Sequence, residues 1–369
     1  MNIIIDVFVL ISSFYLIARV IDKYFVEALE IISKKLKLSS DISGATFMAV
    51  GSSAPELFIA IFALFRISQS EQAIGSGTIV GSAIFNILVI IGFSALVKHA
   101  VLTWQPVIRD MIFYISSILI LLFVFIDGQV TLMETTLFLL FYLFYISSFP
   151  TWKKLFPYKI NSDELEEFVA NNNEIKGSKL QQFVDKLLSY CFVDLNKKSN
   201  LYNLNFLISI IFLAGLSHIM VESSISIAHF LHIPEVVIGL TILAAGTSIP
   251  DLLSSINVAK RGKGDMAVAN AVGSNIFDIN IGLGLPWFVM LLFTKTPIAV
   301  STEGLYSSIF LLLATVIALF FLLISSKWKM GRHAGILLVM LYIFYLLNQA
   351  GIMKATFCFY LPKEICFGI

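Results

Sequence analysis

The sequence has 369 residues, of which only 13% are charged and 58% are hydrophobic, with 33 phenylalanines and a mean hydropathy of +0.90. Soluble domains carry about 25% charged residues and about 45–50% apolar ones. This composition excludes a water-soluble enzyme and a disordered chain, and it predicts a polytopic membrane protein. The net charge of +1 provides no basic field for nucleic acid. The three cysteines form no CxxC pair, which argues against a disulfide framework and a thiol metal site.

Ten stretches of the chain are long and apolar enough to cross a bilayer, whose hydrocarbon core requires about 20 residues of helix. They cover residues 3–21, 42–65, 73–97, 110–126, 130–149, 204–228, 235–259, 266–293, 304–325 and 333–350. We therefore expect an all-α polytopic fold with about ten transmembrane helices.

The basic residues test this count, because cytosolic loops of membrane proteins are enriched in Lys and Arg. With the N-terminus placed outside, twenty of the 25 basic residues fall in inside loops and four in outside segments. The sequence thus predicts both termini on the side opposite to the cytosol. We expect the plasma membrane as the host, with an intracellular membrane as the alternative.

A polar stretch at residues 150–203 divides the chain into two membrane halves. It contains eight lysines and an acidic run at 163–167, and one short amphipathic helix is expected near 180–192. We interpret it as a cytosolic linker that acts as a solvated tether, with a regulatory role as the alternative. The halves are residues 1–149 and 204–350, and a tail follows at 351–369.

The two halves contain the same two motifs in the same order. Gly51–Glu56 (GSSAPE) corresponds to Gly246–Asp251 (GTSIPD), and Gly81–Ile87 (GSAIFNI) corresponds to Gly273–Ile279 (GSNIFDI). Each half has an odd number of spans, so the second copy is inverted relative to the first. Inverted repeats are typical of secondary transporters, whose sites lie near the bilayer midplane between the repeats. The motif regions extend over residues 44–97 and 239–290.

Three carboxylates lie well inside predicted spans and within these motifs: Glu56, Asp251 and Asp278. An ionisable side chain in mid-span is costly and therefore usually has a function. Since Lys and Arg are absent from the centres of the same helices, we expect a cation to balance these charges.

The residues around the carboxylates offer oxygen ligands. Pro55 and Pro250 lack a backbone N–H, which we expect to free carbonyl groups one turn earlier, around Ala49 and Ala244. All-oxygen ligand sets suit Ca²⁺ and Na⁺ rather than zinc or copper. The predicted hydroxyl and amide ligands are Ser52, Ser53, Ser82, Asn86, Thr247, Ser248, Ser274 and Asn275.

Two simpler interpretations apply to other residues. Gly75, Gly77, Gly282 and Gly284 are expected to allow close helix packing. Acidic residues nearer to span ends are expected to reach the interface or to cap helices; they are Asp6, Asp110, Glu134 and Glu222.

The sequence favours neither ATP use nor proteolysis. No Walker A string is present, so ATP is not an expected partner. The string Gly262–Asp265 (GKGD) matches one half of an intramembrane aspartyl protease, but Asp265 lies in a basic loop and the Tyr-Asp partner motif is absent. The protease is therefore a remote alternative, and we expect no catalytic residues and no cofactor besides transported ions.

Residues 44–58 (GATFMAVGSSAPELF), together with residues 240–251 and 264–287, resemble the two alpha repeats of the potassium-dependent sodium/calcium exchangers of the calcium/cation antiporter superfamily. The likeness covers nearly all of both membrane halves. It implies exchange of Na⁺ for Ca²⁺, with K⁺ co-transport, by alternating access in which the first and sixth helices slide against the rest. The alternatives are a K⁺-independent Na⁺/Ca²⁺ exchanger and a Ca²⁺/H⁺ exchanger of the same superfamily.

The resemblance also implies roles for individual residues. Glu56 and Asp251 would be the central carboxylates shared by Ca²⁺ and Na⁺. Asp278, whose position in the first repeat is occupied by Asn86, would correspond to the residue associated with K⁺ use. The remaining ion ligands would be the side chains of Ser52, Ser53, Ser82, Thr247, Ser248 and Ser274 and the carbonyls of Ala49 and Ala244.

Overall fold

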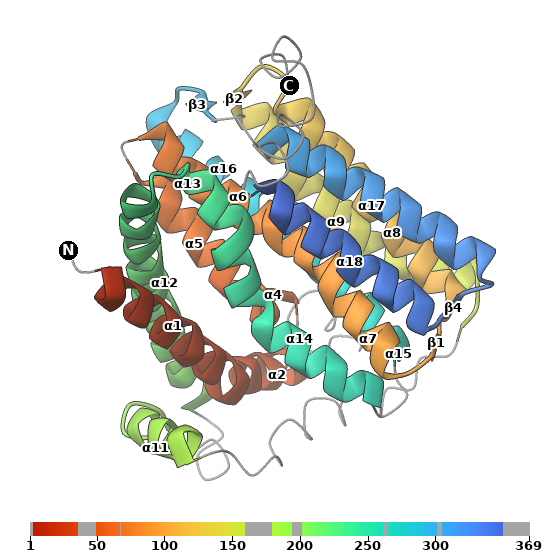
Figure 1. Cartoon of the computed structure of the whole chain (residues 1–369), viewed down its shortest axis with the longest axis horizontal. Helices are drawn as coiled ribbons and strands as arrows, with labels where there is room; N and C mark the ends of the chain where they lie inside the picture. The colour runs from red at the N-terminus through yellow and green to blue at the C-terminus, as the bar shows by residue number, and fades with distance from the viewer. Residues whose placement is uncertain are drawn as a thin grey trace.

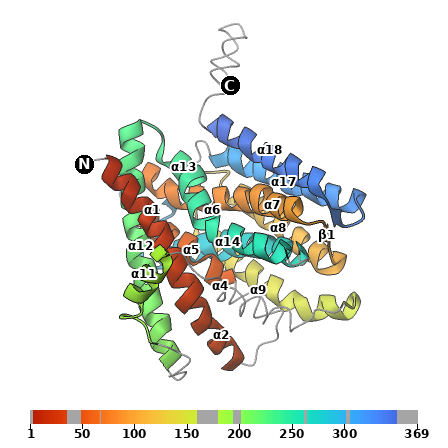
Figure 2. The ribbon, with the colours of Figure 1, turned by 60° about the horizontal axis from the view of Figure 1, so that its bottom comes forward.

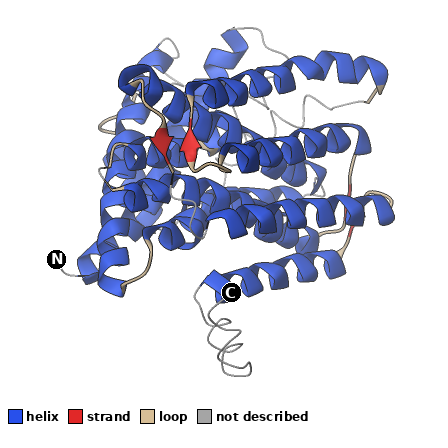
Figure 3. Cartoon of the chain, turned by 90° about the horizontal axis from the view of Figure 1, so that it is seen from above, coloured by secondary structure: helices blue, strands red, loops and turns tan. Residues whose placement is uncertain are grey.

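The computed structural model describes residues 3–35, 49–66, 68–158, 179–193, 201–260, 264–300 and 305–349. These residues are almost entirely helical (Figures 1 and 3). The first half and the linker contain α1 (Ile3–Val20), η1 (Ile21–Phe25), α2 (Val26–Lys35), α4 (Ala49–Ser52), α5 (Ala54–Leu64), α6 (Gln69–Phe85), η3 (Asn86–Ile90), α7 (Ile91–Val97), β1 (Ala100–Val101), α8 (Trp104–Val124), β2 (Gln129–Val130), α9 (Leu132–Leu155) and α11 (Lys179–Leu188).

The second half repeats this order of elements. It contains α12 (Tyr202–Leu231), α13 (Glu235–Ile238), η5 (Gly239–Leu243), α14 (Ala244–Lys260), α15 (Gly264–Phe277), η6 (Asp278–Leu283), α16 (Gly284–Thr294), β3 (Ile298–Ala299), α17 (Leu305–Ser325), β4 (Lys329–Met330) and α18 (Arg332–Gln349). The segments labelled η are single π-helical turns that continue the helices on either side of them.

Eight helices in the described part of the chain are long and apolar enough to cross a membrane. They match eight of the ten predicted spans. The predicted span 42–65 is present as α4 and the short apolar helix α5, while residues 42–48 lie outside the described residues. The last predicted span corresponds to α18, which is helical throughout but begins with Arg332 and His333 and is not among the eight.

The short strands show that the repeats are inverted. β1 lies between the third and fourth spans of the first half, and β3 occupies the same place in the second half. β1 pairs with β4, and β2 pairs with β3, both antiparallel. Because α8 separates β1 from β2, the two small sheets lie at opposite ends of this helix. The equivalent strands β1 and β3 are therefore at opposite ends of the molecule, as the odd number of spans predicts.

Buried apolar side chains form two clusters. The larger cluster joins α6, α8, α9, α15 and α17. The second is built around α1 and α12, which pack along each other, and it also includes residues of α5 and of the linker helix α11. The pair α1 and α12 is thus held mainly by its own cluster, at one side of the bundle (Figures 1 and 2).

Glycines bring the motif helices into backbone contact. A Cβ atom on Gly77 would lie 2.9 Å from the Val236 carbonyl, and one on Gly239 would lie 2.7 Å from the Ile74 carbonyl. Cβ atoms on the other three glycines that were expected to allow packing would also lie within 3.0 Å of neighbouring helices or side chains: Gly75, Gly282 and Gly284. The packing role predicted for these glycines is confirmed.

Candidate cation site

The first repeat places Glu56 at the start of a broken helix. Ser53 separates α4 from α5, and Pro55 lies in the first turn of α5, where its missing N–H costs no hydrogen bond. The Glu56 carboxylate follows at once, near the positive end of the helix dipole, which favours an anionic group. Its side chain is only 2% exposed.

The second repeat differs in this detail, because α14 continues through Pro250 without a break. Thr247 and Ser248 on this helix are buried, whereas Asp251 is only partly buried. The side chains of the equivalent residues Glu56 and Asp251 therefore differ in solvent exposure.

The second motif of each repeat contributes one face of a buried helix. Ser82, Asn86, Ser274 and Asp278 are all buried, with at most 2% of each residue exposed. Asn86 begins the π-turn η3, and Asp278 begins the π-turn η6, so the same irregularity occurs at equivalent positions of the two repeats. Single π-turns within α-helices occur frequently at functional sites.

Polar contacts occur between the repeats as well as within them. The amide of Asn86 donates to Asn275 Oδ1 at 2.7 Å, and Ser274 Oγ lies 3.5 Å from the same nitrogen. Thr247 lies beside the Glu56 carboxylate, as does Ser82.

The second buried carboxylate has the same kind of neighbour. Ser53 of the first repeat lies beside Asp278 of the second. The carboxylate of Glu56 is close enough to those of Asp251 and Asp278 for their negative charges to repel one another. Each buried carboxylate thus has a hydroxyl group from the opposite repeat next to it.

Several oxygen atoms of this group lack a hydrogen-bond partner. In the described residues, twelve buried side-chain oxygens have none, and six of them belong to predicted site residues: Ser53 Oγ, Glu56 Oε2, Ser82 Oγ, Asn86 Oδ1, Ser248 Oγ and Asp278 Oδ1. Buried polar atoms are normally paired, and leaving one unpaired costs about 1–3 kcal/mol. A concentration of unpaired oxygens from both repeats is the arrangement that a hard cation would stabilise.

The three acidic residues do not converge into one tight cluster. Among the described residues, no group of three Asp, Glu, His or Cys side chains is placed to hold a metal ion. A cation in this region would therefore take one or two carboxylate oxygens and complete its shell with hydroxyl, amide and carbonyl oxygens.

The backbone carbonyls differ from the sequence expectation. The Ala49 carbonyl accepts from the Ser53 backbone N–H at 2.9 Å and from Ser52 Oγ at 3.3 Å. The Ala244 carbonyl lies 3.3 Å from Thr247 Oγ1. Because a proline at position i removes the donor for the carbonyl at i−4, Pro55 and Pro250 instead deprive Gly51 and Gly246 of a partner. A carbonyl has two lone pairs, so Ala49 and Ala244 remain candidate ligands.

The sequence matches the family described as sodium/calcium exchanger protein over residues 6–149 and 202–351. The chain belongs to this family. It is 33% identical to sodium/potassium/calcium exchanger 5 of Homo sapiens, with 93% of this chain and 82% of the relative aligned. It is 29% identical to sodium/potassium/calcium exchanger 1 of Gallus gallus, with 94% of this chain and 78% of the relative aligned.

Solved structures of other proteins share the fold of this protein. The sodium-calcium exchanger NCX_Mj soaked with zero Na⁺ and Ca²⁺ superposes with a TM-score of 0.55 at 24% identity, covering 94% of this chain and 99% of that one. The predicted family and the predicted architecture are both confirmed.

Sequence reasoning named Asn275 but missed three buried residues that support the candidate site: Tyr114, Ser117 and Asn280. Asn275 donates to the Tyr114 hydroxyl at 2.9 Å and to the Ala83 carbonyl at 3.1 Å. Asn280 in η6 is fully buried and donates to Ser117 Oγ at 2.7 Å. Tyr114 and Ser117 come from α8, outside the repeated motifs, so no motif comparison could have found them. The amide residue Asn280 in mid-span was the one available signal.

The remaining acidic residues have mixed outcomes. Glu134 completes a capping box with Thr131, as predicted. Glu222 is exposed and forms an ion pair with Arg66. The prediction for Asp110 was wrong, because this residue is buried and pairs with Arg109 at 2.8 Å. The guanidinium of Arg109 also lies over the Phe149 ring, and this cation–π contact stabilises its buried positive charge.

Asp6 also differs from the prediction. It is 6% exposed and accepts from Ser226 Oγ at 2.7 Å, which connects α1 to α12. This acidic residue therefore joins two helices instead of reaching the interface.

Proposed function

We propose that this protein is a secondary-active antiporter that exchanges Na⁺ for Ca²⁺, with K⁺ co-transported, by alternating access. The observation that supports this most directly is the group of six unpartnered buried oxygens contributed by both repeats around Glu56 and Asp278. The relatives are named sodium/potassium/calcium exchangers, which agrees with a site for all three ions.

Competition of the two ions for shared oxygen ligands suffices for coupling. Glu56 and Asp251 would be shared by Ca²⁺ and Na⁺, and since the two ions compete for the same oxygens, binding of one would exclude the other. Asp278 would serve K⁺. The further ligands are Ser52, Ser53, Ser82, Asn86, Thr247, Ser248 and Ser274, with the carbonyls of Ala49 and Ala244.

The pair α1 and α12 would be the moving element. It has its own apolar cluster, distinct from the main core. The Phe14 ring of α1 lies directly against Gly246 of the second repeat, where a Cβ atom would clash with it. Movement of α1 would therefore uncover or cover this motif.

The proposal extends to location and partners. The two halves, 1–149 and 204–350, would form the two repeats of a multi-pass plasma-membrane protein, since the Na⁺ gradient that drives exchange is maintained there. Linker 150–203 would be cytosolic, and the tail 351–369 would lie on the other side. The expected partners are inorganic cations and the lipid bilayer, without ATP, nucleic acid, an organic cofactor or catalytic residues.

A flux assay tests this function. The purified protein is reconstituted into vesicles, and ⁴⁵Ca²⁺ uptake is measured while Na⁺, K⁺ and pH gradients are varied separately. Uptake that requires opposing Na⁺ and is increased by K⁺ on the Ca²⁺ side supports the proposal. Uptake driven by a proton gradient without Na⁺ would identify a Ca²⁺/H⁺ exchanger, and uptake without any counter-ion would identify a channel.

A further inference from the structure

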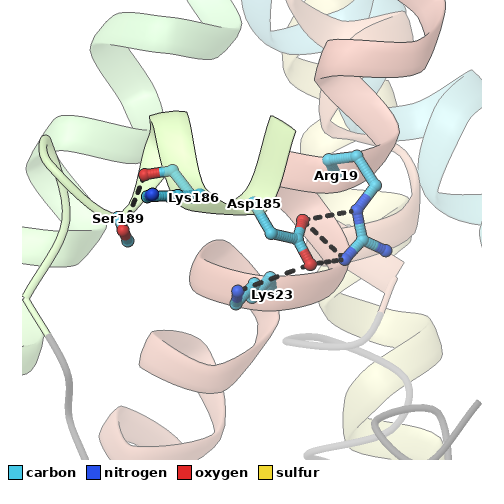
Figure 4. A network of polar contacts seen from close by, with 5 residues as sticks. All are labelled: Arg19, Lys23, Asp185, Lys186 and Ser189. Carbon is cyan, nitrogen blue, oxygen red and sulfur yellow. Dashed lines mark hydrogen bonds and ion pairs between the residues drawn. The ribbon is translucent and has the colours of Figure 1, made fainter. Parts of the chain in front are cut away.

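An ion pair whose two side chains are mostly shielded from water attaches the linker helix α11 to α1. Asp185 accepts two hydrogen bonds from the Arg19 guanidinium at 2.8 Å and one at 3.0 Å, and Lys23 Nζ lies 3.5 Å away (Figure 4). The side chains of Arg19 and Asp185 are only 16% and 22% exposed. Two-pronged guanidinium–carboxylate contacts fix orientation as well as position.

Apolar and backbone contacts attach the same segment to α12. Val184, Leu188 and Phe192 belong to the cluster around α1 and α12. The Phe192 ring stacks on Tyr24 with 3.9 Å between centroids. Asn205 of α12 accepts from the Val193 N–H and donates to the Val193 carbonyl. The segment is therefore docked on both helices and is not a free tether.

A second apolar face of α11 remains uncovered. The side chains of Leu180, Phe183, Leu187 and Tyr190 are between 57% and 78% exposed. At 100° per residue Leu180, Phe183 and Leu187 form a continuous stripe on α11, and Tyr190 follows in the turn directly after the helix. The stripe lies about 130° from the docked face, and the exposed polar side chains of Lys186 and Ser189 occupy the third side. The helix thus has three different sides: one packs against α1 and α12, one is polar and exposed, and one is apolar and exposed.

The attachment points place α11 at the level of a membrane surface. Arg19 lies sixteen residues after Ile3, about 24 Å along the helix at 1.5 Å per residue. A hydrocarbon core about 30 Å thick that begins near the exposed Ile4 and Ile5 therefore ends close to Arg19 and Lys23. Arg and Lys side chains concentrate at this boundary. Asn205, the other attachment, lies within the first turn of the span α12.

We propose that α11 is a membrane-surface helix whose stripe of Leu180, Phe183, Leu187 and Tyr190 inserts into the headgroup–acyl boundary of the bilayer beside α1 and α12. An amphipathic helix of this kind buries its apolar face about 5–10 Å into that boundary. The exposed Lys186 would meet the lipid headgroups.

Site-directed spin labelling of the full-length protein in phosphatidylcholine vesicles tests this proposal. Cys191, Cys358 and Cys366 are first replaced by Ser. Single labels are then introduced through Phe183→Cys and Leu187→Cys on the stripe, with Lys186→Cys and Ser189→Cys as matched controls on the polar side. Collision rates with oxygen, which enters lipid, and with a water-soluble nickel chelate are compared.

The expected result is a several-fold higher oxygen-to-nickel ratio at the two stripe positions than at the two controls. Equal ratios at all four positions, with the nickel chelate reaching the stripe, would overturn the proposal. Dipolar broadening between labels at Phe183→Cys would show that a second copy covers the stripe, which would also overturn it. The measurement does not depend on transport, so it tests the placement of α11 independently of the proposed antiport.

Discussion

At the scale of single residues, the proposed site depends on buried oxygens that protein groups leave unpaired. Glu56 and Asp278 are almost completely buried, and each has one carboxylate oxygen without a hydrogen-bond donor. Two other buried acidic residues of the membrane helices have partners: Asp110 pairs with Arg109, and Asp6 pairs with Ser226. This contrast separates acidic residues used for packing from those available to a cation.

Glu56→Gln tests the central carboxylate. The amide keeps the shape but loses the charge that would attract Ca²⁺, and an interaction with a charged group is worth about 1.5–3 kcal/mol. We expect Na⁺-driven ⁴⁵Ca²⁺ uptake to fall by roughly tenfold to a hundredfold or more. Glu222→Gln is the control, since this exposed residue pairs with Arg66 away from the site. Equal uptake by Glu56→Gln and the unmodified protein would disprove the assignment.

Asp278→Asn tests the K⁺ role. It restores the residue type that the first repeat has at the equivalent position, Asn86, so the buried helix should tolerate it. We expect Na⁺-driven Ca²⁺ flux to persist and its stimulation by K⁺ to disappear, measured in vesicles with and without K⁺. If the unmodified protein shows equal Ca²⁺ flux in both conditions, the K⁺ assignment is wrong.

At the scale of elements, the two repeats contact each other through backbone. Gly81 lies against the Leu240 carbonyl, and a Cβ atom there would also be 2.7 Å from Ala244 Cβ. Its repeat equivalent Gly273 has no neighbouring atom within 4 Å of a Cβ position. The inverted repeats are therefore equivalent in sequence at this position but not in packing.

Gly81→Ala and Gly273→Ala form a matched pair for this asymmetry. Overpacking costs about 1–3 kcal/mol, so Gly81→Ala should lower the thermal midpoint of the detergent-solubilised protein. Gly273→Ala should leave it unchanged or raise it, because alanine is the better helix former. The midpoints are measured by size-exclusion chromatography after heating. A larger loss for Gly273→Ala would contradict the observed helix crossing.

The docking of α11 makes a further prediction at this scale. Asp185→Asn removes the charge that pairs with Arg19 but keeps the size of the side chain. We expect amide hydrogen exchange in residues 180–188 to accelerate by roughly tenfold, as a loss of about 1.4 kcal/mol implies. Lys186→Gln on the polar side is the control and should leave the exchange rates unchanged. Identical rates in both variants would show that the ion pair does not hold the helix.

At the scale of the whole molecule, the described basic loops agree with one orientation in the membrane. Lys98 and Lys329 lie beside the sheet of β1 and β4, whereas Lys295 lies at the opposite end beside β3. This separation follows from the inverted repeat, since equivalent loops are at opposite ends of the bundle.

Cysteine labelling in intact cells tests this orientation. Lys295→Cys and Lys329→Cys are each introduced after the three native cysteines have been replaced by Ser. A membrane-impermeant maleimide added outside should label Lys295→Cys only, and Lys329→Cys should react after the cells are opened. The cysteine-free protein serves as the background control. Labelling of Lys329→Cys in closed cells would reverse the proposed orientation.

Much of this protein could be predicted from the sequence alone. The composition predicted a membrane protein, and the apolar stretches located most of the membrane helices. Two repeated motifs predicted Glu56, Asp251 and Asp278 as candidate ion ligands. Membrane spans and motifs are local properties of the chain, because each is recognised from the residues of one continuous segment.

Tertiary structure decided what these residues touch. The placement of Thr247 beside Glu56 and of Ser53 beside Asp278, the support of Asn275 by Tyr114, and the docking of α11 through Asp185 all join segments far apart in the chain. The burial of Arg109 with Asp110 is of the same kind, because it depends on the helices packed around them. Hydropathy and motif spacing carry no information on which distant helices meet, so these contacts were determined only by how the two repeats pack together.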